Sequence, residues 1–335
     1  MSHAVQAVSG MIESGSLTPG VRVERFGLPD HTAARFEMPA PALRGLVGSY
    51  HVFDSEKEWR DGVKPWLLPS WPAIRFILAP DTIALTIGSR RYDPMPVAAL
   101  YGNASRAMQM TTHGGVTIGV DLTPLGWSRL FDARADDHRD RVVPLDTLLP
   151  AGWVACALDR LRASDRSTQV KAILDDLLLA IVRPPGRDDD QIVALHRLIA
   201  DEDTRDLTSA AASLGMSPAA LRRLSTRYFG FPPKTLLIRT RFVRSLVRMM
   251  LAGGGANYAA MAPTYFDASH FLRDADRFLG MTPRRFLQQD HRYLIACLNG
   301  LAEVRRADTV QRGAGAARPR LVAAESRSVE KLASS

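Results

Sequence analysis

The chain has 335 residues, of which 46% are hydrophobic and 23% charged, and its formal net charge is +8. This length predicts two or three folded domains, and no apolar run reaches the roughly 18 residues that a membrane span needs. The first residues lack the basic head and long apolar stretch of a secretory signal. The two cysteines, Cys156 and Cys297, are too few and too far apart for a disulfide framework or a clustered zinc site. We therefore expect a cytoplasmic protein with no membrane association.

The basic charge is concentrated in one segment of the chain. A stretch rich in Pro and Asp at residues 183–190 suggests a linker between domains. Residues 1–190 hold 21 Lys and Arg against 23 Asp and Glu, whereas residues 191–306 hold 17 against 9, and 16 of those 17 are Arg. Arginine suits bidentate contacts with phosphate and with base edges. Charge alone is equally compatible with a solvated basic surface. The order of residues within the segment has to distinguish such a surface from a nucleic-acid-binding one.

The first part of the chain reads as a β-rich domain over residues 1–150. Short runs of β-branched or alternating residues at 74–78, 82–87 and 115–120 are separated by Gly, Pro, Asp and Asn. Closely spaced strands without long helical patterns between them favour an antiparallel barrel or sandwich. Helical periodicity begins near residue 151 and marks residues 151–190 as a helical connector and linker. Its broad apolar stripe fits either domain core or a partner helix.

Residues 191–300 are expected to be helical, and they contain a first pair of short helices with clear boundaries. Asp206 can cap a helix that Gly215 ends, and Ser217 followed by Pro218 is typical of a new helix start. The apolar positions of the first helix recur at helical spacing: Leu207, Ala210, Ala211 and Leu214. In the second helix the inward positions are Leu221, Leu224 and Tyr228, and the outward ones are Ala219, Arg222, Arg223 and Thr226. Two short helices joined by a Gly turn, with an Arg-bearing outer face, indicate a helix-turn-helix motif.

A second unit of the same kind follows about 50 residues later. Asn257 can cap a helix over residues 258–262, and Asp267 can cap the next one over residues 268–279. That helix should bury Phe271, Ala275 and Phe278 and expose Ala268, Ser269, Leu272 and Arg273. A connector over residues 234–251, ending at the glycines 253–255, would be about 27 Å long. Successive major grooves on one side of DNA lie about 34 Å apart, so one chain could reach two of them.

At this point the sequence resembles the AraC-type (arabinose-regulator-like) transcription factors over about residues 195–290. The segments that carry the resemblance are LGMSPAALRRL, YFGFPPKTLLIRTRFVRSL and YFDASHFLRDADRFLGMTPRRF. The resemblance implies a sequence-specific DNA-binding transcriptional regulator, not an enzyme, with no cofactor. By position it implies base-reading sites at Ala219, Arg222 and Arg223 and at Ala268, Ser269 and Arg273. Residues 102–106 and 140–149 are similar, more loosely, to cupin-like sensor domains, which bind a ligand, dimerise or do both.

The expected fold class is therefore multidomain α+β, with a β-rich cupin-like N-terminal domain and a helical C-terminal domain that carries two helix-turn-helix motifs. The expected partners are double-stranded promoter DNA, RNA polymerase, a small-molecule effector and a second copy of the chain. The tail over residues 307–335 is rich in Ala, Arg, Ser and Gly and is expected to be disordered.

The second unit departs from the family pattern. Thr264 occupies a turn position where the family usually has Gly, and Pro263 removes a backbone donor just before it. Ala259 replaces a larger aliphatic residue. We expect the second motif to bind more weakly and to discriminate bases less than the first.

Several residues admit other readings. Arg239, Arg241, Arg244 and Arg248 on the connector could contact phosphate or form ion pairs within the domain. The neighbours Ser269 and His270 point about 100° apart on a helix and do not make a nucleophile–base pair. His31, His51 and His113 lack the spacing of a cupin metal site, and Tyr50, Trp66 and Trp71 fit either an effector pocket or the core. Two alternatives stay open: a cupin-type metal enzyme fused to a DNA-targeting domain, and a constitutive DNA binder whose N-terminal domain only dimerises.

Overall fold

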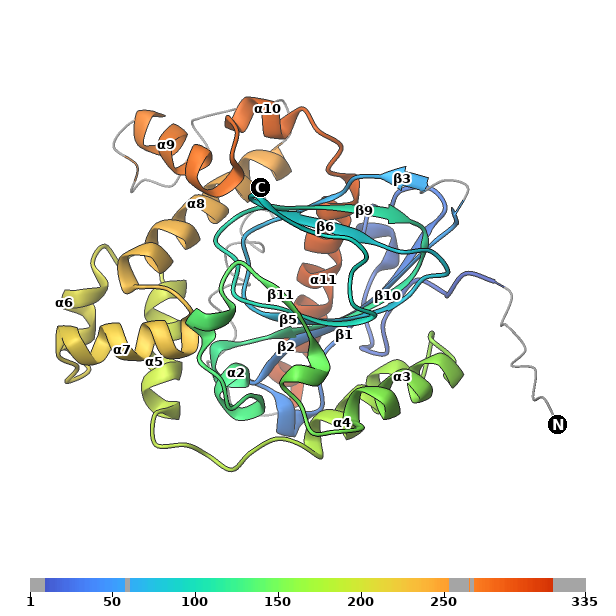
Figure 1. Ribbon diagram of the computed structural model, residues 1–335, viewed down its shortest axis with the longest axis horizontal. Helices are drawn as coiled ribbons and strands as arrows, with labels where there is room; N and C mark the ends of the chain where they lie inside the picture. Colours follow the sequence, from blue (N-terminus) through green and yellow to red (C-terminus); the bar gives the residue numbers. More distant parts are fainter. Residues whose placement is uncertain (1–9, 58–60, 253–264, 266–267, 316–335) are drawn as a thin grey trace.

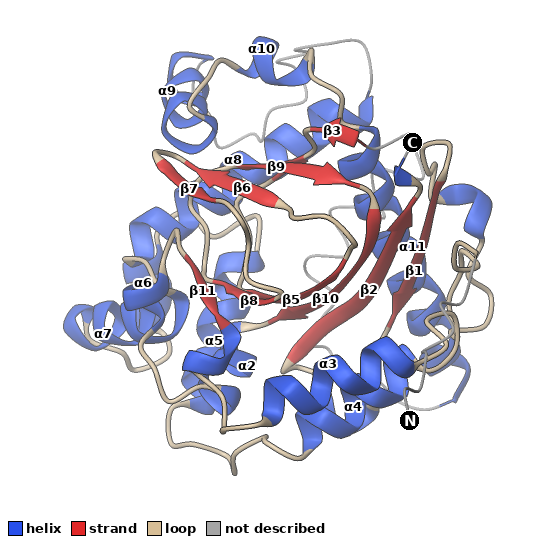
Figure 2. Ribbon diagram, turned by 45° about the vertical axis from the view of Figure 1, so that its right-hand side comes forward, coloured by secondary structure: helices blue, strands red, loops and turns tan. Residues whose placement is uncertain are grey.

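The computed structural model describes residues 10–57, 61–252, 265 and 268–315, and two antiparallel sheets face each other in its N-terminal half (Figure 2). The larger sheet has six strands. In spatial order they are β1 (Thr32–Glu37), β2 (Val47–Ser55), β10 (Gly115–Leu122), β5 (Ala73–Leu78), β8 (Ala98–Tyr101) and β11 (Val142–Pro144). All five pairings are antiparallel.

The smaller sheet closes over the inner face of the larger one. In spatial order its strands are β3 (Asp61–Val63), β9 (Met108–His113), β6 (Ala84–Ile87) and β7 (Arg90–Tyr92). A further strand, β4 (Trp66–Leu67), also pairs with β9. Side chains of both sheets fill the space between them, among them Ile77, Leu85, Tyr101 and Met110. Strand positions alternate between two faces, so the neighbours of these residues point the other way. The antiparallel β-rich N-terminal domain expected from the sequence is confirmed.

Three helices cover the outer face of the larger sheet: α2 (Pro124–Leu130), α3 (Trp153–Ala163) and α4 (Val170–Leu179). The strands send Val52, Phe76 and Ile118 into the same buried cluster as Trp127 and Leu174. Four short 3₁₀ turns complete the domain: η1 (Val23–Arg25), η2 (Pro41–Leu43), η3 (Ala135–His138) and η4 (Leu145–Thr147). The apolar stripe of the connector is therefore domain core and not the surface for a partner helix.

The C-terminal half is helical and lies at the left and top of Figure 1. Its helices are α5 (Asp189–Ala200), α6 (Leu207–Ala212), α7 (Pro218–Phe229), α8 (Pro233–Ala252), α9 (Ala268–Leu279) and α10 (Pro283–Leu287). One buried cluster joins α5, α6, α7 and the start of α8, and another joins the rest of α8 to α9 and α10. Each cluster holds one of the two expected recognition helices.

The last helix, α11 (Arg292–Gly315), returns to the β-rich domain and packs on β1 and η1 (Figure 1). Gly300 lies so close to Phe36 that a Cβ atom would come within 2.1 Å of the phenyl ring. Further along, Ala307 is buried and Asp308 pairs with Arg44 at 2.9 Å. The expected disorder of the tail is therefore wrong for residues 307–315, because contacts with the β-rich domain stabilise a helix that composition alone does not indicate. Residues 316–335 lie outside the described residues.

Among the helices that the structure describes, none is long and apolar enough to cross a lipid bilayer.

Candidate nucleic-acid interface

The first helix-turn-helix motif has the boundaries that its sequence predicts. The Asp206 carboxylate accepts hydrogen bonds from the backbone amides of Thr208 and Ser209, both at 3.0 Å, and so caps α6. The Ser217 hydroxyl accepts from an amide in the first turn of α7 at 3.2 Å. Gly215 between the helices has φ +70°, a conformation that costs glycine little and other residues more. Local chemistry therefore fixes both ends of the turn.

The two helices pack through most of the residues expected inside; Ala210 is half-buried, and Leu214 and Tyr228 also depart from the expectation. Leu207 and Ala211 of α6 are buried together with Leu221 and Leu224 of α7. Leu214, expected on the apolar face, is 41% exposed because α6 ends at Ala212 and the chain has already turned away. Tyr228, also expected inside, is half-buried and donates its hydroxyl to Asp188 at 2.8 Å.

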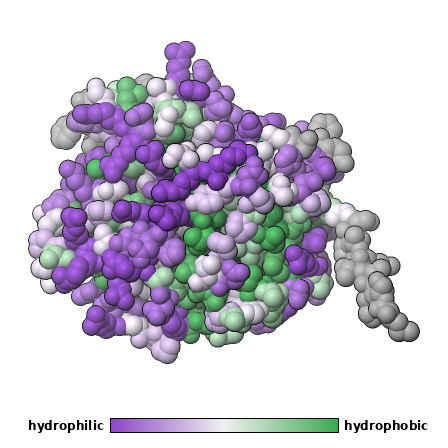
Figure 3. All heavy atoms as spheres, in the orientation of Figure 1, coloured by the Kyte–Doolittle hydropathy of each residue, from purple (hydrophilic) through white to green (hydrophobic). Residues whose placement is uncertain are grey.

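The outer face of α7 presents an unpaired basic surface. Ala219, Arg222 and Arg223 are exposed, and no carboxylate among the described residues forms an ion pair with either guanidinium. Thr226 is half-buried, and its hydroxyl donates to the Arg222 carbonyl oxygen at 2.9 Å. That bond leaves the hydroxyl oxygen as an acceptor. The molecular surface around α6 and α7 is mostly hydrophilic (Figure 3).

The second expected recognition helix, α9, has the buried and exposed faces that its sequence predicts. Phe271, Ala275 and Phe278 are buried, and the ring of Phe242 on α8 lies 5.2 Å from the first phenyl ring and 5.4 Å from the second. The exposed side of α9 carries Ala268, Ser269, His270, Leu272 and Arg273. The first helix of this motif, with Asn257, Ala259, Pro263, Thr264, Asp267 and the glycines 253–255, lies outside the described residues, so the expected weaker docking stays a prediction.

Three connector arginines form ion pairs within the helical domain. Arg248 contacts both carboxylate oxygens of Glu202 at 2.7 and 2.8 Å, and Arg244 lies 3.8 Å from the same group. Arg241 lies 3.7 Å from Asp274. Of the two open readings for these residues, the contacts favour ion pairing over phosphate binding.

The fourth connector arginine, Arg239, joins the two domains. It is only 3% exposed, and it donates to the carbonyl oxygens of Ser70 at 3.3 Å and Ala104 at 3.0 Å. Its guanidinium lies 4.3 Å from the ring centre of Trp71. These contacts reach the β-rich domain, which neither expected role included, and nothing in the sequence signals a partner 169 residues away.

The aromatic residues considered for an effector pocket serve other roles. Trp71 packs on Phe229 at the end of α7, and Trp66 packs on Phe286 of α10, so both lie in the contact between the domains. Tyr50 is buried on the outer face of the sheet and donates to Asp175 of α4 at 2.8 Å. These contacts favour a packing role over an effector pocket for all three side chains.

The histidines of the β-rich domain do not converge. His31 contacts Glu56 at 2.7 Å, whereas His51 is buried near Asp121 at 3.6 Å. Burial lowers the pKa of His51, so its ring is neutral at pH 7. No group of three His, Cys, Asp or Glu side chains suited to a metal ion occurs within the part of the chain that the structure describes.

Comparisons with known proteins agree with this geometry in the helical half. Residues 210–289 match a family model described as a helix-turn-helix domain. No curated protein sequence matches the chain significantly.

Solved structures of ToxT from Vibrio cholerae are distantly similar. The structure with bound unsaturated fatty acid is 11% identical, with a TM-score of 0.39 over 68% of this chain and 91% of that one. Another ToxT crystal form is 10% identical, with a TM-score of 0.40 over 71% and 97%. A likeness of this degree transfers neither a ligand nor a DNA sequence to this chain.

Proposed function

We propose that the chain is a sequence-specific DNA-binding transcriptional regulator, because residues 210–289 match a helix-turn-helix family model and the sequence resembles the AraC-type regulators. In this proposal α7 and α9 read adjacent major grooves through Ala219, Arg222, Arg223 and Thr226 and through Ala268, Ser269 and Arg273. The observation that carries it is the outer face of α7, where two exposed arginines extend from a capped helix without a carboxylate partner among the described residues.

Unpaired guanidinium groups favour this role for an energetic reason. An arginine held by an internal carboxylate would have to lose that ion pair before it could contact a base. Arg222 and Arg223 carry no such cost, and a good bidentate arginine–guanine pair gives about 1–3 kcal/mol of discrimination. The three arginines paired on α8 offer the contrast, because their charges are already partly neutralised.

The spacing between the helices also supports the proposal. Helix α8 has 20 residues and is therefore about 30 Å long. Major grooves on one side of the duplex are separated by about 34 Å. A rigid helix of this length suits two reading heads that occupy consecutive grooves.

The β-rich domain would supply control, either by binding a small effector or by pairing two copies of the chain. Contact with RNA polymerase would then convert DNA binding into regulation.

The experiment is selection of bound duplexes from a random DNA library by the full chain. We expect enrichment of a motif with two short blocks about 10 base pairs apart. Arg222→Ala combined with Arg223→Ala should abolish enrichment of one block. The matched control is Arg162→Ala, which removes an exposed arginine on α3, away from both reading helices. Absence of any enriched motif with the unmodified chain would contradict the proposal.

A further inference from the structure

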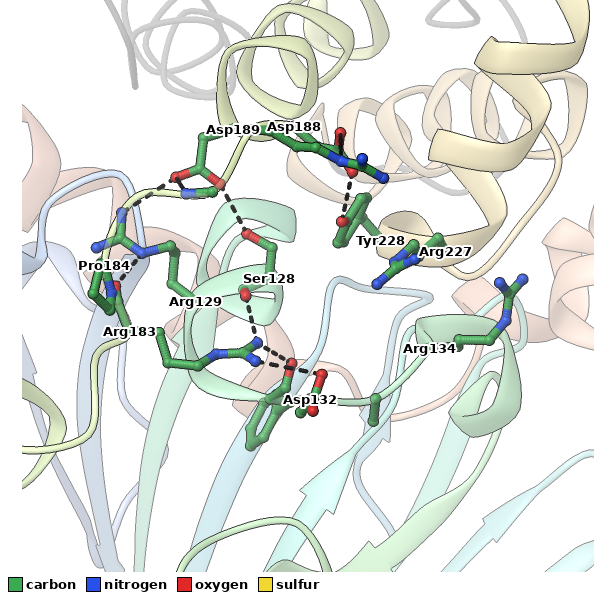
Figure 4. Close-up of a pocket in the computed structure, with 14 residues that line it drawn as sticks. Ser128, Arg129, Asp132, Arg134, Arg183, Pro184, Asp188, Asp189, Arg227 and Tyr228 are labelled. Atoms are coloured by element: carbon green, nitrogen blue, oxygen red, sulfur yellow. Dashed lines mark hydrogen bonds and ion pairs between the residues drawn. The ribbon is translucent and has the colours of Figure 1, made fainter.

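A hollow of about 330 Å³ lies where three parts of the chain meet. Its walls come from residues 128–134 at the end of α2, from residues 183–189 of the interdomain linker, and from Arg227 and Tyr228 in the last turn of α7 (Figure 4). The hollow therefore touches the β-rich domain, the covalent link and the first expected recognition helix at once.

Two of its five arginines build the wall. The Arg129 guanidinium donates to the carbonyl oxygen of Arg183 at 2.5 Å and to Asp189 at 3.3 Å. The Arg183 guanidinium donates to the carbonyl oxygens of Ser128, at 2.6 Å, and Phe131. These bonds tie the linker to α2, and Arg183 also lies 3.5 Å from the carboxylate of Asp132.

The other three arginines are less engaged, and each comes from a different part of the chain. Arg227 has no carboxylate partner among the described residues and lies against the ring of its neighbour Tyr228. Arg134 is half-exposed, and among the described residues its ion-pair partner is Asp136, two residues away. Arg187 is 89% exposed and lies 3.4 Å from its neighbour Asp188, its ion-pair partner within the described part of the chain. The lining as a whole holds five arginines against three aspartates, so positive charge is left uncompensated.

From this arrangement we propose that the hollow binds a small organic anion, a phosphate ester or a carboxylate, between Arg134 of the β-rich domain and Arg227 of α7. Guanidinium groups bind phosphate and carboxylate through paired, charge-assisted hydrogen bonds. The volume is at the lower end of the range for small-molecule sites, about 300–1,000 Å³. Burial, helped by the hydrogen bond to Asp188, raises the pKa of Tyr228, so its hydroxyl stays protonated at the rim.

The position gives such an anion a regulatory consequence, which rests on the proposed function. Arg227 lies four residues after Arg223, one turn along the same helix. An anion bridging Arg134 and Arg227 would hold α7 in its present position against the β-rich domain. If DNA binding requires another position, anion and DNA will compete; if it requires this one, they will cooperate.

The test uses the full chain without DNA, and the probes are inorganic phosphate and citrate with chloride at matched ionic strength as reference. A probe present at about ten times its Kd should raise the Tm by about 2 °C. Arg134→Gln and Arg227→Gln should each abolish the rise. Both side chains are at the surface, so folding should be preserved, and Arg162→Gln is the matched control that should keep the rise.

Two results would overturn the inference. One is the absence of saturable binding of both phosphate and citrate. The other is a rise that persists undiminished in Arg134→Gln and Arg227→Gln.

DNA-binding measurements on the same variants distinguish a small anion from a phosphate of the DNA duplex as the occupant of the hollow. If the hollow receives the DNA backbone, neither probe will bind, and Arg134→Gln will reduce the salt dependence of DNA binding by about one phosphate contact. That outcome also contradicts the small-anion site. Because the thermal measurement needs no DNA, failure of the anion site and failure of the proposed DNA-binding function are distinguishable.

Discussion

Replacing Arg239 by methionine tests how strongly the connector helix is fixed to the β-rich domain. Methionine keeps an unbranched apolar stem of similar reach but removes the donors. The carbonyl oxygens of Ser70 and Ala104 would then lose a charged donor, and Trp71 would lose the guanidinium 4.3 Å from its ring centre.

The magnitude follows from these contacts. A hydrogen bond from a charged donor contributes about 1.5–3 kcal/mol, and the bond to Ser70, at 3.3 Å, belongs at the weak end. A desolvated cation–π contact adds about 2 kcal/mol. Methionine recovers part of the packing, so we expect a net loss of about 3–5 kcal/mol in the free energy of unfolding.

Urea denaturation of the full chain, followed by tryptophan fluorescence, measures this loss. Arg248→Met is the matched control on the same helix. It breaks a pair with Glu202, which is 42% exposed, and such pairs contribute at most about 1 kcal/mol. If Arg239→Met destabilises the chain no more than Arg248→Met does, Arg239 does not fix the connector helix to the β-rich domain.

Three further predictions follow from other parts of the molecule. Gly300→Ala should destabilise the chain by about 1–3 kcal/mol in urea denaturation, because overpacking against the Phe36 ring outweighs the higher helix propensity of alanine. An increase in stability would contradict the packing of α11 on the β-rich domain. Burial raises the pKa of Cys297 to about 12, so iodoacetamide at pH 8 should modify the exposed Cys156 and spare Cys297, as peptide mass spectrometry would show. Equal modification would mean that the β-rich domain does not cover the Cys297 thiol of α11. Arg222→Ala should reduce selectivity for the bound duplex more than Arg273→Ala does in a competition assay, and equal losses would refute the expected weakness of the second motif.

The helix-turn-helix region was predictable because its signals are local. A capping carboxylate at Asp206, a glycine able to take positive φ at Gly215, and the pair Ser217 and Pro218 each act within three residues of the backbone groups they stabilise. Helical spacing also predicted the two faces of α9. These features need no knowledge of the rest of the chain.

Contacts between distant segments were not predictable in the same way. Nothing around Arg239 in the sequence indicates that Ser70 is its partner, and its periodicity suits an exposed basic face equally well. Likewise, the composition of the Ala- and Arg-rich end of α11 is typical of a disordered tail. It is helical because the β-rich domain buries Ala307 and provides Arg44 as the ion-pair partner of Asp308. The role proposed for Arg227 has no local signal in the sequence, because it depends on Arg134, which comes from another domain.

The most direct test of the central claim is the affinity of the full chain for its selected duplex relative to a scrambled one, measured by fluorescence anisotropy at fixed salt. We predict that Arg222→Ala combined with Arg223→Ala lowers this ratio by about 10- to 100-fold, as expected for the loss of one bidentate arginine–base contact, while Arg162→Ala leaves it unchanged. A ratio that stays the same in the double variant would contradict base reading by α7.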